Sequence, residues 1–277
     1  MLVLMEPFVP MDAHDGTKVF QIRDWLDKIP NLSVGFTSRD GGISVKPWSS
    51  LNCALHVGDS LEAVVENRKR LSAAAGFRFD AWTCAEQTHG SQVRVVAGSD
   101  AGAGRTSRED AFADTDGLVT NQPGIMLAAF YADCVPLFFA DPVRRAVGIA
   151  HAGWKGTALQ IAIRTAEKMT EAFGTRPEDL YAAIGPSIGP CCYEVDERVV
   201  QEIGLTYPER KDNGRYMLDL KEANRQFMIR AGIKPNNIEL TSYCTCCRTD
   251  LFFSHRGENG STGRMTAWIG MKDEVTR

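Results

Sequence analysis

The sequence lacks the features of an exported, membrane-bound or nucleic-acid-binding protein. Its most apolar stretch, Ile125 to Ala140, contains Asp133 and Pro136 and is shorter than the roughly 20 residues of a membrane-spanning helix. The apolar run at the N-terminus ends at Glu6, too early for the core of a signal peptide. A formal net charge of −4 offers no basic surface for phosphate backbones. We therefore expect a cytoplasmic monomer or homodimer with a small-molecule substrate and no membrane or nucleic-acid partner.

Histidine is scarce, with five residues and no His-x-His pair. Eight cysteines are a moderate number, and a reducing cytosol favours free thiols or metal ligands over disulfides. The sequence also has no internal repeat and no linker rich in proline, glycine or serine. We expect one domain over residues 1–277, with residues 1–30 as an N-terminal extension.

Short apolar runs rich in β-branched and aromatic residues predict strands, and segments with helical spacing between some of them predict helices. The predicted strands are Ser33–Thr37, Gln92–Val96, Gly117–Val119, Ile125–Phe130, Leu137–Ala140, Ala146–Ala150, Leu180–Ile184 and Met265–Ile269. The predicted helices are Leu61–Ala75, Thr157–Phe173, Asp196–Ile203 and Leu220–Ala231. This mixture indicates a layered α/β or α+β domain.

Three segments place a possible metal ligand next to residues that form tight turns at predicted strand ends. The ligands are His89, Cys134 and His151. Strand ends can bring side chains from distant positions to one point. Two imidazoles and one thiolate would leave the fourth zinc position for water or substrate, as in catalytic zinc sites. A single histidine or cysteine is, however, more often a core or surface residue, and distances cannot be derived from spacing.

These segments resemble the conserved blocks of the laccase-domain family, whose members are also described as multicopper polyphenol oxidoreductases and as purine nucleoside phosphorylases. The resemblance spans most of the chain. Its blocks are Thr37–Ser44, Ser50–Asn52, Glu66–Arg68, Glu86–Gly90, Ala132–Pro136, His151–Gly156, Gly185–Val195, Phe252–Arg256 and Thr262–Arg264.

The resemblance implies an α-β-β-α sandwich with two mixed sheets between helices, and a metal site on His89, Cys134 and His151. It also implies a zinc-dependent phosphorylase for adenosine, inosine, guanosine and methylthioadenosine, with adenosine deaminase activity. Other relatives remove L-serine from UDP-N-acetylmuramoyl-L-serine, which is a peptidoglycan-editing amidase reaction and an alternative function. Lys155 stands where the family often has arginine, and His255 and Gly257 stand where tyrosine and arginine are frequent, which affects the expected substrate preference.

A copper-dependent polyphenol oxidase is the other alternative. A blue-copper centre uses two histidines and a cysteine, and a trinuclear copper cluster needs many more imidazoles. Five histidines cannot build both centres. Copper can still occupy the single site in place of zinc.

Further residues are candidates for substrate contact or proton transfer. Arg39, Gln87, Lys155 and Arg264 are candidates for substrate binding, and Asp133 for orienting a ligand or carrying a proton. Each charged residue has an alternative role on the solvated surface, and Asp133 has one as a turn former. Gly153 and Gly156 either expose backbone N–H groups to an anion or only form a turn before the helix.

A second group of cysteines comprises Cys191, Cys192, Cys244, Cys246 and Cys247. They could form a structural zinc site. Their C-x-C and C-C pairs are not the usual spacing, which favours partly buried free thiols. We leave them outside the predicted site.

Overall fold

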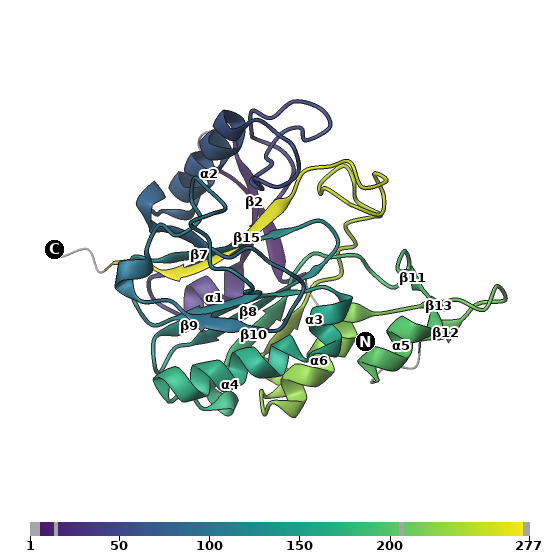
Figure 1. Ribbon diagram of the computed structural model, residues 1–277. Coiled ribbons are helices and arrows are strands. Elements are labelled where there is room, and N and C mark those ends of the chain that lie inside the picture. The colour runs from purple at the N-terminus through teal and green to yellow at the C-terminus, as the bar shows by residue number, and fades with distance from the viewer. Residues whose placement is uncertain (1–5, 14–15, 205–207, 274–277) are drawn as a thin grey trace.

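The computed structural model describes residues 6–13, 16–204 and 208–273. These residues form two six-stranded sheets and one three-stranded sheet, and helices pack on the outer faces of the two large sheets. Figure 1 shows helix α2 (Leu61–Ala75) on the upper side of the stacked sheets and helices α4 (Ile161–Phe173) and α6 (Leu220–Arg230) on the lower side. The predicted α-β-β-α layering of an α/β (α+β) fold is confirmed.

The first sheet has the order β1-β2-β3-β15-β7-β4. Its strands are antiparallel except for the parallel pair β4 and β7. The strand bounds are β1 Phe8–Asp12, β2 Lys18–Ile22, β3 Leu32–Thr37, β4 Trp82–Cys84, β7 Met126–Tyr131 and β15 Met265–Met271.

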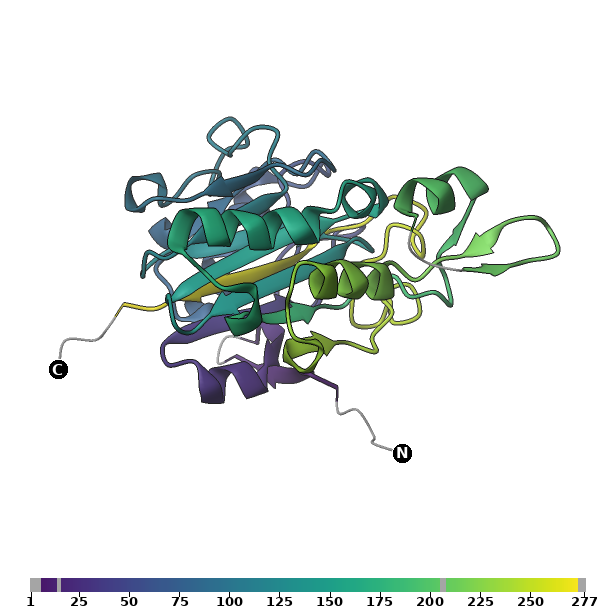
Figure 2. The same cartoon turned by 90° about the horizontal axis from the view of Figure 1, so that it is seen from below.

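The second sheet has the order β14-β10-β8-β9-β6-β5, with parallel pairs at both edges. Its strands are β5 Val93–Val95, β6 Gly117–Thr120, β8 Val135–Asp141, β9 Ala146–Ala152, β10 Tyr181–Ile184 and β14 Ile238–Leu240. The small sheet contains β11 Glu194–Val195, β12 Glu209–Arg210 and β13 Tyr216–Met217, and projects from the body of the molecule beside α5 (Figure 2).

The remaining helices are short. They are α1 Arg23–Lys28, α3 Trp154–Ala158, α5 Glu197–Ile203 and the 3₁₀ turns Phe79–Ala81, Gly98–Asp100, Pro177–Asp179 and Pro235–Asn237. Within residues 6–13, 16–204 and 208–273, none of the helices combines the length and the apolar character needed to cross a lipid bilayer.

Strand β7 shows why the central strands are continuously apolar. Leu127, Ala129 and Tyr131 face the core between the two sheets, whereas Met126 and Ala128 face the core beneath α2. Side chains alternate across a strand, so a strand with a core on each face needs apolar residues at every position. A third core lies between the second sheet and α4 with α6.

All eight predicted strands are present, with bounds that differ by at most two residues. One predicted helix is wrong: Thr157–Phe173 is two helices, α3 and α4, separated at Gln160, which has a left-handed φ of 60°. The turn lets α3 follow the end of β9 while α4 packs along the second sheet. Within the predicted extension, Phe8–Asp12 form β1, Lys18–Ile22 form β2 and Arg23–Lys28 form α1, and β2 pairs with β3.

Candidate metal centre and its cavity

The structure brings His89, Cys134 and His151 together. His89 lies in the loop after β4, Cys134 lies in the turn between β7 and β8, and His151 is near the end of β9. Strands β8 and β9 pair with Pro136 opposite His151, which places Cys134 beside that histidine. The Cys134 Sγ and His89 Nε2 atoms are 4.0 Å apart. One donor atom from each of the three residues lies within 4.8 Å of the others.

The backbone around the site is strained. Gln87, His89 and Asp133 have φ angles of 61°, 63° and 84°, a region that costs non-glycine residues of order 1 kcal/mol or more. Asp116, directly before β6, offsets this cost near His89. Its carboxylate accepts hydrogen bonds from the backbone N–H groups of Thr88, His89 and Gly90 at 3.1, 3.0 and 2.7 Å.

The same Asp116 carboxylate contacts the His151 ring, with 2.9 Å between Oδ1 and Nδ1. This contact fixes the ring and leaves Nε2 for a metal, as outer carboxylates do in zinc sites. Sequence reasoning missed Asp116. The available signal was its place in Thr115-Asp116-Gly117, immediately before a predicted strand.

Asp133 makes different contacts. Its Oδ1 accepts hydrogen bonds from the hydroxyls of Thr245 and Ser254, both at 2.7 Å, and its Oδ2 accepts one from the backbone N–H of Arg256 at 2.7 Å. Asp133 therefore connects the segment 245–256 to the turn that carries Cys134. The carboxylate that contacts the His151 ring belongs to Asp116 and not to Asp133.

Cys134, His151 and Asp116 shift one another's protonation. Burial raises the pKa of Cys134, but the charge of His151 and hydrogen bonds from His151 and His89 outweigh burial and lower that pKa to about 6. Burial lowers the pKa of His151, but Cys134 and Asp116 raise it to about 9. For Asp116 burial raises the pKa, whereas His151 and the backbone N–H groups produce a net lowering. The metal-free site thus favours a thiolate, the form that binds metal.

The donor set fits a metal ion with three protein ligands. Zinc binds imidazole nitrogen at about 2.0–2.1 Å and thiolate sulfur at about 2.3 Å, which donor atoms a few ångströms apart can satisfy together. Gly153 supports this close approach. A β-carbon at this position would lie 2.9 Å from His89 Cδ2 and 3.2 Å from Cys134 Sγ. The position therefore requires glycine, because any side chain would crowd these two residues.

The three candidate ligands line a cavity of about 430 Å³. That volume lies within the range of about 300–1,000 Å³ typical of small-molecule sites. Of the other predicted site residues, Gln87, Asp133 and Arg264 line the cavity, and Arg39 and Lys155 are not among its lining residues. Gln87 is also fixed to β7, because its side-chain amide exchanges two hydrogen bonds with the Phe130 backbone at 2.8 and 2.7 Å.

Arg39 and Lys155 have partners elsewhere. The Arg39 guanidinium lies 3.1 Å from Glu258 Oε1, donates to the Thr249 carbonyl at 2.7 Å and stacks over Phe253. The Lys155 ammonium lies 5.6 Å from the centre of the Trp154 ring.

Sequence reasoning also missed several lining residues, among them His56, Tyr193 and Arg256. Tyr193 and Arg256 belong to the quoted blocks and are in contact, with the guanidinium carbon 5.5 Å from the ring centre. Burial and the positive charges of Arg264 and Arg108 hold the pKa of His56 below its ordinary value. The cavity therefore combines two arginines, the neutral imidazole of His56 and the aromatic ring of Tyr193 with the three candidate metal ligands.

A family model for multi-copper polyphenol oxidoreductase laccase matches residues 33–272. The chain belongs to this family. Family membership implies metal binding, and the group of His89, Cys134 and His151 is the candidate site.

Similar proteins in the family are named as enzymes. The chain is 45% identical over 267 residues to purine nucleoside phosphorylase YlmD of Geobacillus stearothermophilus, covering 92% of this chain and 97% of that protein. It is 41% identical to a purine nucleoside phosphorylase of Deinococcus radiodurans, covering 89% and 92% of the two chains. The crystal structure of YlmD from Geobacillus stearothermophilus superimposes with a TM-score of 0.90, at 40% identity, over 96% of this chain and all of that one. These similarities support an enzymatic role.

Proposed function

We propose that the protein is a zinc-dependent purine nucleoside phosphorylase for adenosine, inosine, guanosine and methylthioadenosine, with adenosine deaminase activity. The observation that carries the proposal is a single cavity that holds the metal ligands, two arginines and an aromatic ring. Relatives that match nearly the whole chain are named purine nucleoside phosphorylases.

The cavity residues suit the parts of such a substrate. Arg256 and Arg264 provide cations for phosphate, which must approach an electron-poor ribose carbon as an anion. The Tyr193 ring provides a face on which a purine base can stack. Arg39 and Lys155 stay predictions for an anion subsite, and the cavity favours Arg264 over both.

His89, Cys134 and His151 would hold the zinc ion, and copper can replace it with the same donors. When bound, the ion would supply a Lewis acid and an acidified water molecule. Asp116 keeps the His151 ring oriented. Asp133 stays a candidate for proton transfer. Before its Oδ1 atom could accept a proton, the hydrogen bonds from Thr245 and Ser254 would have to break.

The proposal is tested with the purified zinc-loaded protein, incubated with inosine or adenosine in the presence and absence of phosphate. Phosphorolysis predicts free base and ribose 1-phosphate only when phosphate is present. Deamination predicts conversion of adenosine to inosine in either condition. A Cys134→Ala variant is the control, because it removes one candidate ligand and should lose the metal of this cavity and turnover together while it remains folded.

Parallel reactions distinguish the alternatives. Release of serine from UDP-N-acetylmuramoyl-L-serine, with no phosphate-dependent cleavage of nucleosides, would replace the proposal with the amidase. Oxygen consumption with a polyphenol by the copper-loaded protein, again without nucleoside cleavage, would replace it with the oxidase.

A further inference from the structure

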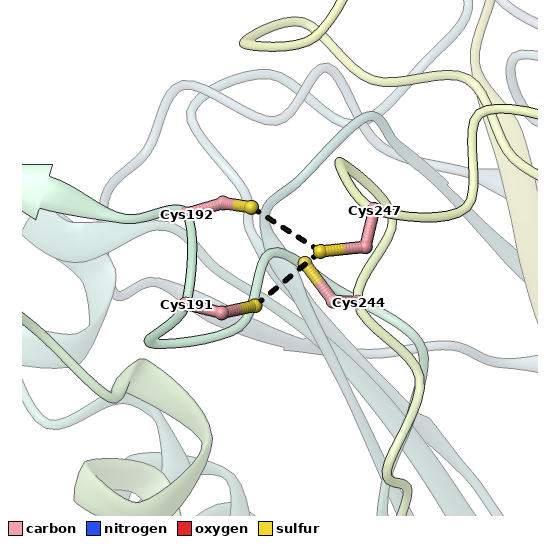
Figure 3. A group of neighbouring side chains, drawn as sticks. All are labelled: Cys191, Cys192, Cys244 and Cys247. Atoms are coloured by element: carbon pink, nitrogen blue, oxygen red, sulfur yellow. Dashed lines mark hydrogen bonds between the residues drawn. The ribbon is translucent and has the colours of Figure 1, made fainter.

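A second cluster of cysteines lies outside the cavity. Cys191 and Cys192 lie in the turn after β10, and Cys244 and Cys247 lie in the loop after β14. The four side chains point toward one another in Figure 3. The Cys247 sulfur is 3.5 Å from that of Cys191 and 3.4 Å from that of Cys192, and all four sulfur atoms lie within 4.8 Å of one another.

The spacing of the cluster differs from the expectation drawn from the sequence. Cys246 lies outside the group, and the two cysteines of this loop that take part are Cys244 and Cys247. They form a C-x-x-C pair, which is a usual spacing for zinc ligands. The sequence interpretation of free thiols considered only the C-x-C and C-C pairs in this loop and so overlooked the two-residue gap.

Sulfur atoms 3.4–3.5 Å apart are not disulfide-bonded, since that bond is about 2.05 Å long. Four thiolates at about 2.3 Å from a central zinc ion lie at the corners of a tetrahedron with edges of about 3.8 Å. The observed separations, from 3.4 Å to at most 4.8 Å, bracket that edge length. An all-sulfur donor set selects a thiophilic metal.

The surroundings hold the cluster in place. The backbone N–H of Gly189 donates a hydrogen bond to Cys244 Sγ at 3.2 Å, and Thr245 N–H donates to the Ser187 carbonyl at 3.0 Å. The Lys221 ammonium, which is 5% exposed, donates to the carbonyls of Thr241 and Tyr243, both at 3.0 Å. Donors to sulfur and a buried cation nearby both stabilise thiolate charge.

We propose that Cys191, Cys192, Cys244 and Cys247 bind a second, structural zinc ion, separate from the metal on His89, Cys134 and His151. Four thiolates close the coordination shell, so this ion has no position for a substrate. Its role is to cross-link the turn after β10 to the loop after β14.

Both cross-linked segments continue into the cavity. The turn after β10 carries Ile188 and Tyr193, and the other segment leads to Arg256, all of which line the cavity. Thr245, between two of the cysteines, donates its hydroxyl to Asp133, the neighbour of Cys134. The second ion therefore stabilises one wall of the cavity without touching its contents.

The experiment counts zinc per chain by elemental analysis in full-length protein purified under reducing conditions. We expect about two ions in the unmodified protein, about one in Cys247→Ser and in Cys191→Ser, and about two in the matched control Cys246→Ser. Cys134→Ala should also retain about one ion, because it affects only the other site. Amide hydrogen exchange should rise at residues 186–195 and 241–256 in Cys247→Ser and stay unchanged in Cys246→Ser.

The absorption spectrum of bound cobalt provides a second measurement. It leaves all four cysteines of the cluster in place, so it does not depend on whether a variant of the cluster folds. Cobalt bound to Cys134→Ala should give the intense sulfur-to-metal charge-transfer absorption of a four-thiolate site. The proposal is overturned if that spectrum lacks such absorption, or if Cys247→Ser and Cys246→Ser contain equal zinc. A disulfide within the cluster of the zinc-purified protein, detected by mass spectrometry of its peptides, would overturn it as well.

Discussion

At the scale of single residues, Asp116 links the loop that carries His89 to the ring of His151 in the candidate metal site. One carboxylate accepts three backbone N–H groups of the His89 loop and contacts His151 Nδ1. Its position depends on strand pairing, because β6 and β9 pair with Gly117 opposite Ala150. That register puts Asp116 beside His151, and a shift by one residue would turn its side chain to the other face.

Asp116→Asn should weaken metal binding by about 10- to 100-fold, as changes to outer carboxylates of metal sites do. The amide keeps the size of the side chain but loses the charge and one acceptor. Competition with a chelator measures the affinity. Asp141→Asn is the control, because Asp141 is equally buried but accepts from Val143 and Arg144 at the distant end of β8. Equal affinity in the two variants would contradict the role of Asp116.

Arg264→Ala should raise the KM for phosphate by about tenfold or more, since a hydrogen bond or ion pair to a charged group contributes roughly 1.5–3 kcal/mol. Arg264 lines the cavity, and its guanidinium donates to the carbonyls of Thr262 and Gly263. Arg39→Ala should instead lower stability, because its contacts are with Glu258 and Thr249. The KM for phosphate and the thermal unfolding of both variants distinguish the two roles. The opposite pattern would restore Arg39 as the anion ligand.

The lowered pKa of Cys134 predicts a pH dependence in the metal-free protein. An ordinary thiol has a pKa of about 8.5, so its thiolate is lost below that pH. With a pKa of about 6, the Cys134 thiolate persists as the pH falls to about 6, and His151, with a pKa of about 9, stays charged over this window. Alkylation by iodoacetamide after chelation, followed by peptide mass spectrometry, should be half-maximal near pH 6. A midpoint near pH 8.5 would show that the Cys134–His151 ion pair is absent. Cys53 is the control: it is buried, burial raises its pKa to about 11, and it should stay unmodified.

At the scale of elements, central strands were easier to predict from sequence than edge strands. Strands β7, β8 and β9 are buried along their whole length and appear as continuous apolar runs. Strand β1 was missed because it is an edge strand that is mostly exposed, is only five residues long and contains a proline. The predicted helix across Gln160 failed because apolar spacing continues through the break, and only tertiary packing requires the chain to turn there.

The break between α3 and α4 predicts that Gln160→Gly stabilises the protein. Glutamine in the left-handed region costs about 1–2 kcal/mol, which glycine avoids, although glycine gains entropy in the unfolded chain. We expect a net gain of up to about 1 kcal/mol in thermal or urea unfolding. Glu167→Gly, an exposed position inside α4, should lose about 1 kcal/mol. A loss in both variants would contradict the assigned conformation of Gln160.

At the scale of the whole molecule, the site depends on contacts between distant segments. The sequence predicted His89, Cys134 and His151 as candidates because each lies in a turn-forming segment next to a predicted strand and within a block that resembles the family. It could not predict Asp116 or the lining role of His56, since these depend on how two sheets and several loops pack. Apolar residues packed between the two sheets are therefore expected to matter for stability rather than for metal binding.

Phe252→Ala tests this expectation. Phe252 is fully buried between the sheets, and its ring centre lies 5.1 Å from that of Phe20 and 5.6 Å from that of Tyr243. Truncation should lower the free energy of unfolding by about 3–5 kcal/mol while a folded sample still binds metal. Val143→Ala, at a side chain that is 66% exposed, should change it by less than about 0.5 kcal/mol. Urea titration measures both. Similar values would show that the inter-sheet packing is not as described.

The central position of β15 also affects the order in which the chain can fold during synthesis. Strand β3 begins at Leu32, but the neighbour that completes it in the sheet ends at Met271. Strand β15 therefore has to leave the ribosome before it can pair with β3 and β7. Until then both strands expose unpaired backbone edges, which favour association with other chains. Nascent chains arrested before residue 265 should accordingly bind chaperones, and release should follow once β15 emerges.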